Sequence, residues 1–290
     1  SSGDTAPRGV DDDAVTHKLL LGDEEVGGVE GIVRITEKAI RNVGIDTEDA
    51  SKDATGLALW GASIILARWL TRMPCSETWL GKRVIELGAG CGLPAIALAK
   101  HLKSHGIVAE VSATDFNPVT VANLKHNVVA NDVSVSVFGA DWRDFSGREY
   151  DVVIGSDLCY SDSGASALLA ALDATLSLHG QFYYICPDAR GGLVNLLENA
   201  GNIGLVLDSC KFAGDELKQN PLADMGDVEA VRMFLSVTPG DTNACIIWPP
   251  IVDANCRTFT NQLIHPHRMC SSLICEEVLA IACTFSRGQN

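Results

Sequence analysis

Residues 84–94 read VIELGAGCGLP, and this stretch decides the fold. The apolar run VIEL leads into a loop with three glycines, and the helix-forming residues 93–105 follow that loop directly. Pro94 suits the first turn of the helix, where no intrahelical amide hydrogen bond is lost. A strand that enters a helix through a glycine-rich turn is the unit with which doubly wound α/β sheets hold a nucleotide. The stretch therefore predicts such a unit at this position.

Strands and helices alternate along the rest of the chain. Continuous apolar runs are typical of buried parallel strands, whereas apolar spacings of three and four are typical of helices. The expected strands are 83–87, 110–115, 133–141, 150–157, 181–187, 204–212 and 228–238. The expected helices are 57–70, 93–105, 118–131, 163–180 and 191–201. This order predicts a doubly wound, Rossmann-like α/β sheet of seven strands, mostly parallel, with helices on both faces and an antiparallel last strand.

The segments outside this alternation divide the chain. Residues 1–16 are acidic and are expected to form a disordered arm. Residues 17–56 are expected to form an amino-terminal β-hairpin and a linker, because GDEEVGG separates two apolar clusters. The hairpin and the alternating region together form one expected domain, 17–239. Residues 240–290 are a Cys-rich extension of unknown role. Its run HPHRMCSSLIC is compatible with three interpretations of this extension: a zinc site, a docked tail that binds a partner, and a poorly ordered tail.

The chain is acidic, with 22 Lys and Arg against 37 Asp and Glu and a formal net charge of −15. Such a surface repels phosphate backbones, so no nucleic-acid partner is expected, and a basic protein or a cationic small molecule suits it better. No apolar run approaches the roughly 20 residues that span a bilayer, and the acidic start is no signal peptide. Five of the ten Cys are scattered through periodic segments, as buried thiols usually are. We expect a reduced, cytoplasmic or nuclear protein, and a monomer.

The spacing of the glycines distinguishes between nucleotides. A dinucleotide site would read G-x-G-x-x-G, but its third position here is Leu93. The observed pattern is E-x-G-x-G-x-G, from Glu86 through Gly88 and Gly90 to Gly92. This spacing is typical of S-adenosylmethionine (AdoMet) sites, and an acid at the strand end suits a cationic ligand and would repel a pyrophosphate. We therefore expect an AdoMet site that includes Glu86, with a dinucleotide site and a plain tight turn as alternatives.

Two residues at the ends of later strands fit the same cofactor. Asp115 ends the next strand, where an acidic side chain can accept hydrogen bonds from both ribose hydroxyls. Its alternative role is to cap the following helix, for which Asn117 is better placed. Trp142 follows the third strand of this region, where the fold binds adenine, and core packing is its alternative.

Five stretches together resemble a known family. They are GLALWGAS (56–63), VIELGAGCGLP (84–94), TDFNP (114–118), ADWRD (140–144) and SDLCY (156–160). Their order resembles the class I, seven-β-strand protein methyltransferases of family 16, over about residues 17–239. The resemblance implies AdoMet-dependent transfer of a methyl group to a lysine side chain of a protein substrate.

The resemblance also implies roles for single residues. Trp60, which otherwise looks like a core residue of an apolar helix, would lie over the cofactor. The implied cofactor contacts are Trp60, Gly88, Ala89, Gly90, Asp115, Trp142 and Ser156. Asp157 and Tyr160, the D-x-x-Y motif, would be the catalytic pair, and no metal is implied.

The chemistry of methyl transfer gives this pair a physical role. The leaving group is already good, so the enzyme mainly aligns a neutral amine with the methyl group and excludes water. Asp157 can hold and orient an arriving ammonium, and Tyr160 offers a ring face and a hydroxyl. For Asp157 a helix cap is the alternative. For the whole chain the alternatives are a methyltransferase that acts on arginine, histidine or a small amine, an inactive AdoMet-binding interaction module, and a dehydrogenase.

Overall fold

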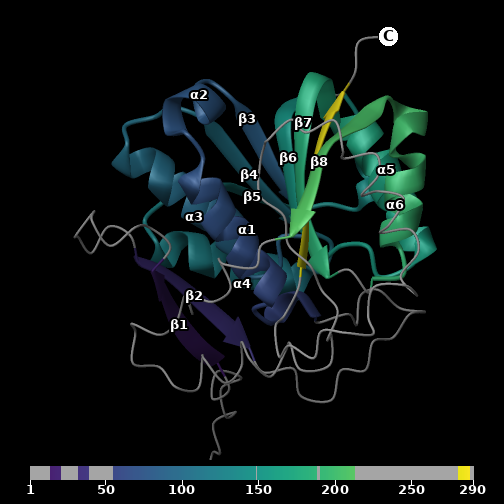
Figure 1. Ribbon diagram of the computed structural model, residues 1–290. Helices are drawn as coiled ribbons and strands as arrows, with labels where there is room; N and C mark the ends of the chain where they lie inside the picture. The colour runs from purple at the N-terminus through teal and green to yellow at the C-terminus, as the bar shows by residue number, and fades with distance from the viewer. Residues whose placement is uncertain are drawn as a thin grey trace, which may run out of the picture.

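Seven strands form one sheet in the order β5-β4-β3-β6-β7-β9-β8 in the computed structural model (Figure 1). The structure describes residues 14–20, 32–38, 55–147, 149–187, 190–212 and 280–287. The strands are β3 (Arg83–Leu87), β4 (Glu110–Asp115), β5 (Ser136–Gly139), β6 (Tyr150–Ser156), β7 (Leu176–Pro187), β8 (Leu205–Phe212) and β9 (Ala280–Arg287). The first five strands in this order are parallel, and β9 is antiparallel to both of its neighbours. The predicted doubly wound sheet with an antiparallel last strand is confirmed.

The helices cover both faces of this sheet. They are α1 (Gly61–Arg72), α2 (Cys75–Trp79), α3 (Leu93–Ser104), α4 (Pro118–Ala130), α5 (Asp162–Thr175) and α6 (Leu193–Asn199). Figure 1 shows α1 and α3 packed together on one face, with α5 and α6 packed together on the other. Asn117 caps α4 as predicted, since its side chain accepts hydrogen bonds from the amides of Val119 and Thr120.

Two predicted helix ends are wrong. The helix expected at 57–70 begins only at Gly61, after a short 3-10 turn, Thr55–Leu57. The helix expected at 163–180 ends at Thr175, and Leu176 already pairs with Tyr150 of β6. Leucines four apart fit a helix, but pairing with a neighbouring strand decides the conformation of this segment.

The last strand of the sheet comes from a segment that the sequence analysis placed outside the domain. Residues 280–287 form β9, which inserts between β7 and β8. A boundary at residue 239 is therefore wrong for these eight residues. The strand expected at 228–238 and the HPHRMC run lie outside the described residues, so their predictions remain untested.

The predicted amino-terminal hairpin forms from β1 (Ala14–Leu20) and β2 (Ile32–Lys38), which pair antiparallel. β1 begins at Ala14, within the predicted acidic arm, and residues 1–13 are outside the description. The hairpin is held by asparagines at four-residue spacing along α4, which bond the backbone of β2. No helix in the described part of the chain is long and apolar enough to cross a membrane.

Candidate functional site

A cavity of about 360 Å³ opens at the carboxyl ends of the parallel strands, within the range of sites for small molecules. Its walls come from the glycine loop after β3, the end of β4, the turn after β5, the loop after β6 and the segment before α1. Nine of the ten predicted site residues lie on these walls: Trp60, Gly88, Ala89, Gly90, Asp115, Trp142, Ser156, Asp157 and Tyr160. The structure thus brings together residues from five separate parts of the chain.

The glycine loop takes a backbone conformation that favours glycine. Gly88 and Gly90 have φ angles of 56° and 55°, in the left-handed region. A Cβ on Gly90 would lie 3.1 Å from the carbonyl oxygen of Gly56, and one on Gly88 would lie 2.6 Å from the side chain of Leu158. The loop can therefore approach both neighbouring segments only because these positions lack side chains.

Asp115 lies at the end of β4 with its carboxylate turned to the glycine loop. Its Oδ2 accepts a hydrogen bond from the amide of Gly90 at 3.0 Å, and its Oδ1 accepts one from the amide of Asn117 at 3.0 Å. A carboxylate oxygen has two acceptor positions, so one oxygen can accept hydrogen bonds from more than one donor. The side chain is fixed in place and faces the cavity, as a ribose-binding acid must be.

Two indole rings complete the wall. The Nε1 of Trp60 donates to the carbonyl of Thr55 at 2.9 Å, which fixes the ring at the start of α1. Trp142 begins a 3-10 turn, Trp142–Asp144, next to Gly88. Both rings are half-buried, so each offers a face to the cavity while it packs against the protein.

Glu86 does not line the cavity, which corrects its predicted role as a cofactor contact. Its side chain is buried behind the loop, where Oε2 accepts a hydrogen bond from the amide of Ala95 at 2.9 Å in the first turn of α3. Burial raises the pKa of this carboxyl from 4.5 to about 8. Glu86 therefore positions the helix that follows the loop, and the acids on the wall, rather than Glu86, set the charge of the cavity.

This pKa makes stability depend on pH with a defined sign. The folded chain retains a proton on Glu86 that the unfolded chain releases, so the free energy of unfolding should fall as pH rises from about 5 to about 8, by up to about 1.4 kcal/mol per pH unit. Glu86→Gln keeps an acceptor for Ala95 but cannot ionise. In urea unfolding, the wild type should lose stability relative to this variant over that interval, and parallel curves would contradict the assignment.

The D-x-x-Y loop after β6 is held by a residue that the sequence analysis missed. Asp157 has a φ angle of 53°, which strains a residue other than glycine. The buried hydroxyl of Tyr184, on β7, accepts hydrogen bonds from the amides of Leu158 at 2.9 Å and Cys159 at 3.0 Å. A tyrosine within an apolar strand was the available signal, because a buried hydroxyl needs a partner.

Arg190 is the second residue that was missed. Its Nε and Nη2 donate to Oδ1 and Oδ2 of Asp157 at 2.6 and 2.7 Å, and its guanidinium lies 5.4 Å from the ring centre of Tyr160. The turn that carries it packs closely on the D-x-x-Y loop, because the amide of Gly192 donates to the carbonyl of Cys159 and a Cβ there would overlap the carbonyl of Ser161. The pair Gly191-Gly192 was the signal for this close approach.

The charges on the wall suit AdoMet better than a dinucleotide. Three acids, Asp115, Asp141 and Asp157, line the cavity, and Arg143 is the one basic residue that faces it among the described lining residues. Arg143 donates to both carboxylate oxygens of Asp141 and lowers its pKa to about 2, so this acid is ionised at neutral pH. Asp141 is paired with Arg143 and Asp157 with Arg190, so the excess negative charge of the wall comes from Asp115. This excess favours a sulfonium or an ammonium, whereas a pyrophosphate would be repelled. The residues present fit AdoMet.

The sheet order, the antiparallel strand β9 and the cavity over the glycine loop define the class I methyltransferase fold. The chain belongs to the lysine methyltransferase family, because the family profile matches residues 40–193, which are 154 of its 290 residues.

Individual relatives are similar over part of their length. Protein-lysine N-methyltransferase EFM3 of Chaetomium thermophilum is 29% identical over 144 residues, 45% of this chain and 41% of that protein. The calmodulin-lysine N-methyltransferase of Arabidopsis thaliana is 31% identical over 165 residues, 53% of this chain and 52% of that protein. A solved TehB-like SAM-dependent methyltransferase from Corynebacterium glutamicum has a TM-score of 0.45 and 14% identity, over 81% of this chain and 91% of that chain. The chain thus spans about half or less of the length of these two curated relatives.

Proposed function

We propose that the chain transfers a methyl group from AdoMet to a lysine side chain of another protein. The observation that carries this proposal is the position of Asp157 on the wall of the cavity that fits AdoMet. Arg190 binds its carboxylate, and Tyr184 holds the loop that follows it. Membership of the lysine methyltransferase family and the names of its relatives support the same acceptor.

The cofactor half of the cavity has identifiable contacts. Gly88 to Gly90 would hold the methionine part against their backbone, Asp115 the ribose hydroxyls, and Trp142 the adenine, with Trp60 as a cover. When bound, AdoMet supplies the methyl group: the lysine nitrogen forms the new N–C bond with its lone pair while the S–C bond breaks and leaves its electrons on sulfur. The residues of the chain have to align the nitrogen and keep water out.

The acceptor half prepares a neutral amine. Each oxygen of Asp157 keeps an acceptor position beside its bond to Arg190, so an incoming lysine Nζ can donate to this carboxylate. The guanidinium of Arg190 disfavours a second positive charge nearby, which lowers the pKa of the lysine and favours the form that has a lone pair. Tyr160, which is 56% exposed, forms the rim of this position. The proton lost from nitrogen passes to solvent at this open side.

The acidic chain suits a lysine-bearing partner, since its net charge of −15 attracts cationic segments. The four cysteines whose side chains are described, Cys75, Cys91, Cys159 and Cys186, are free thiols. Free thiols are compatible with a reducing compartment, and we propose the cytoplasm or the nucleus.

The first test is methyl transfer from labelled AdoMet to protein in a cell extract. The wild type should label a protein, and mass spectrometry should find the label on lysine. Asp157→Asn should lower labelling at least about 100-fold, because the carboxylate that orients the amine is gone. Asp162→Asn, an exposed change five residues away, is the matched control and should retain activity. Label only in small molecules, or on arginine or histidine, would contradict the proposal, as would normal AdoMet binding without transfer.

The second test separates the charge of Arg190 from its packing. Arg190→Gln should raise the pKa of the bound lysine by about one unit, so activity at pH 7 falls about tenfold and the acidic limb of the kcat profile moves to higher pH. Arg190→Lys keeps the positive charge, so the pH dependence of its kcat should be close to that of the wild type. Arg190 does not act on the acceptor lysine if the pH profile of kcat keeps its position in Arg190→Gln. The same conclusion follows if this variant has a lower KM and an unchanged kcat.

A further inference from the structure

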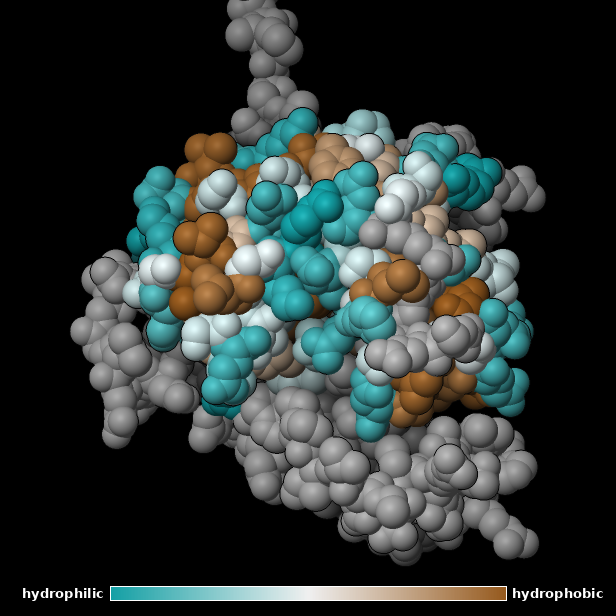
Figure 2. All heavy atoms as spheres, turned by 90° about the horizontal axis from the view of Figure 1, so that it is seen from above, coloured by the Kyte–Doolittle hydropathy of each residue, from teal (hydrophilic) through white to brown (hydrophobic). Residues whose placement is uncertain are grey.

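Three potential metal ligands gather at the end of the molecule that faces away from the cofactor cavity. Cys75 begins α2, and His101 and His105 lie at the carboxyl end of α3. Both segments lead into the amino ends of β3 and β4, whereas the cavity lies at the carboxyl ends of these strands. In Figure 1 this end carries α2, and Figure 2 views the molecule from that side, where hydrophilic and hydrophobic side chains alternate over the described surface.

The geometry of the three side chains fits one metal ion. One ligand atom from each of Cys75, His101 and His105 lies within 4.8 Å of the other two. The histidines are four residues apart, so they project from the same face of α3. A tetrahedral Zn²⁺ holds its ligand atoms about 3.5 Å apart, so small rotations of these side chains complete the site.

The ring of His105 has one nitrogen engaged in hydrogen bonds, which leaves the other for a ligand role. Its Nδ1 lies 2.9 Å from the carbonyl oxygen of His101 and 3.1 Å from the hydroxyl of Ser104. A carbonyl oxygen can only accept, so Nδ1 carries the proton and donates it, which leaves the lone pair on Nε2. Metal-binding histidines characteristically donate their second ring nitrogen to a carbonyl or carboxylate in this way.

The ring of His101 has a nitrogen without a partner. Its Nε2 is buried and has no hydrogen-bond partner among the described residues. A buried polar atom that lacks a partner is costly, and a metal ion would supply one.

We propose that Cys75, His101 and His105 form a Zn²⁺ site. One thiolate and two imidazoles are ligands that zinc prefers, and calcium and magnesium, which take oxygen ligands, are excluded. The fourth position is open to water. The ion would clip the start of α2 to the end of α3 and stabilise this end of the sheet, independently of methyl transfer.

Cobalt provides a direct probe, because Co²⁺ replaces zinc in such sites and a bound thiolate gives a sulfur-to-cobalt charge-transfer band. The wild-type chain of residues 1–290, titrated with Co²⁺, should develop this band together with the intense visible absorption of a tetrahedral site, and Zn²⁺ should remove both. Cys75→Ser should abolish the charge-transfer band. His105→Gln, at an exposed position, should weaken Co²⁺ binding at least about tenfold.

The controls exclude other thiols and misfolding. His126→Gln, an exposed histidine on α4, should leave the spectrum unchanged. Cysteines elsewhere in the chain remain in Cys75→Ser, so a band that survives in this variant would overturn the assignment, as would a wild type without a band. Zn²⁺ should raise the melting temperature of the wild type but not that of Cys75→Ser or His105→Gln, and equal shifts in all three would likewise overturn it.

Discussion

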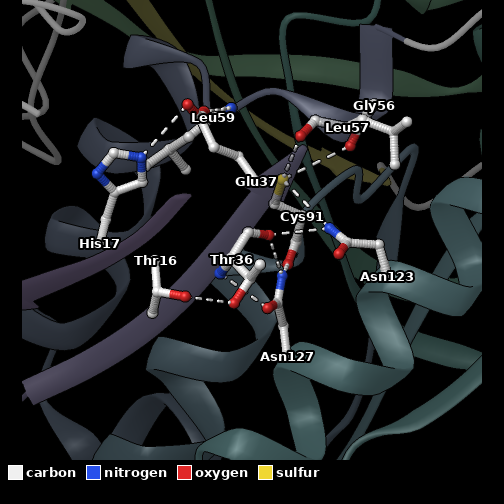
Figure 3. A network of polar contacts seen from close by, with 10 residues as sticks. All are labelled: Thr16, His17, Thr36, Glu37, Gly56, Leu57, Leu59, Cys91, Asn123 and Asn127. Carbon is white, nitrogen blue, oxygen red and sulfur yellow. Dashed lines mark hydrogen bonds and ion pairs between the residues drawn. The ribbon is translucent and has the colours of Figure 1, made fainter. Parts of the chain in front are cut away.

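The amide side chain of Asn127 connects three parts of the molecule that are distant in sequence. Its Oδ1 accepts from the amide of Thr36 at 2.9 Å, and its Nδ2 donates to the carbonyls of Thr36 at 3.0 Å and of Cys91 at 2.9 Å (Figure 3). Asn127 is fully buried, so any of these backbone groups would cost about 1–3 kcal/mol if it lost its partner. The hairpin is thereby fixed to α4 and to the glycine loop at once.

The neighbouring contacts extend this unit to the segment in front of α1. Glu37, next to Thr36, accepts a hydrogen bond from the amide of Leu59 at 3.0 Å, and the Cys91 thiol donates to the carbonyl of Leu57 at 3.4 Å (Figure 3). Since Trp60 follows this segment directly, two parts of the cavity wall, Trp60 and the glycine loop, are held by the same polar network. A cofactor site of this kind depends on the hairpin even though no described residue of β1 or β2 lines the cavity.

The proposed acceptor side of the cavity is built differently, around a strained residue. The backbone of Asp157 costs about 1–3 kcal/mol in its left-handed conformation. Tyr184 from β7 and Arg190 from the turn after it hold this loop from one side. The two sides of the cavity are therefore stabilised separately, the proposed cofactor contacts by the hairpin network and the proposed acceptor position by β7 and the turn that follows it.

Local patterns predicted much of this arrangement and long-range contacts account for the rest. The strand, glycine loop and helix at 84–105, and Asp115 at a strand end, follow from short sequence patterns that the fold uses directly. Arg190 and Tyr184 could not be assigned, because their partner loop lies 25 to 33 residues away and only its folded position reveals the contacts. Glu86 was misplaced because an acid at a strand end can point to the ligand or behind it. β9 was missed because its pairing partners are distant in the chain.

Calorimetric titration with AdoMet tests most directly whether this cavity is a cofactor site. The wild type should bind AdoMet with one site per chain. Asp115→Asn should weaken binding at least about tenfold, since it removes the charge and one acceptor beside the ribose position and places an amide opposite the backbone N–H donors. Asp132→Asn, an exposed change between α4 and β5, should leave the affinity unchanged. Absence of AdoMet binding by the folded wild type, or equal affinity in Asp115→Asn, would contradict the account.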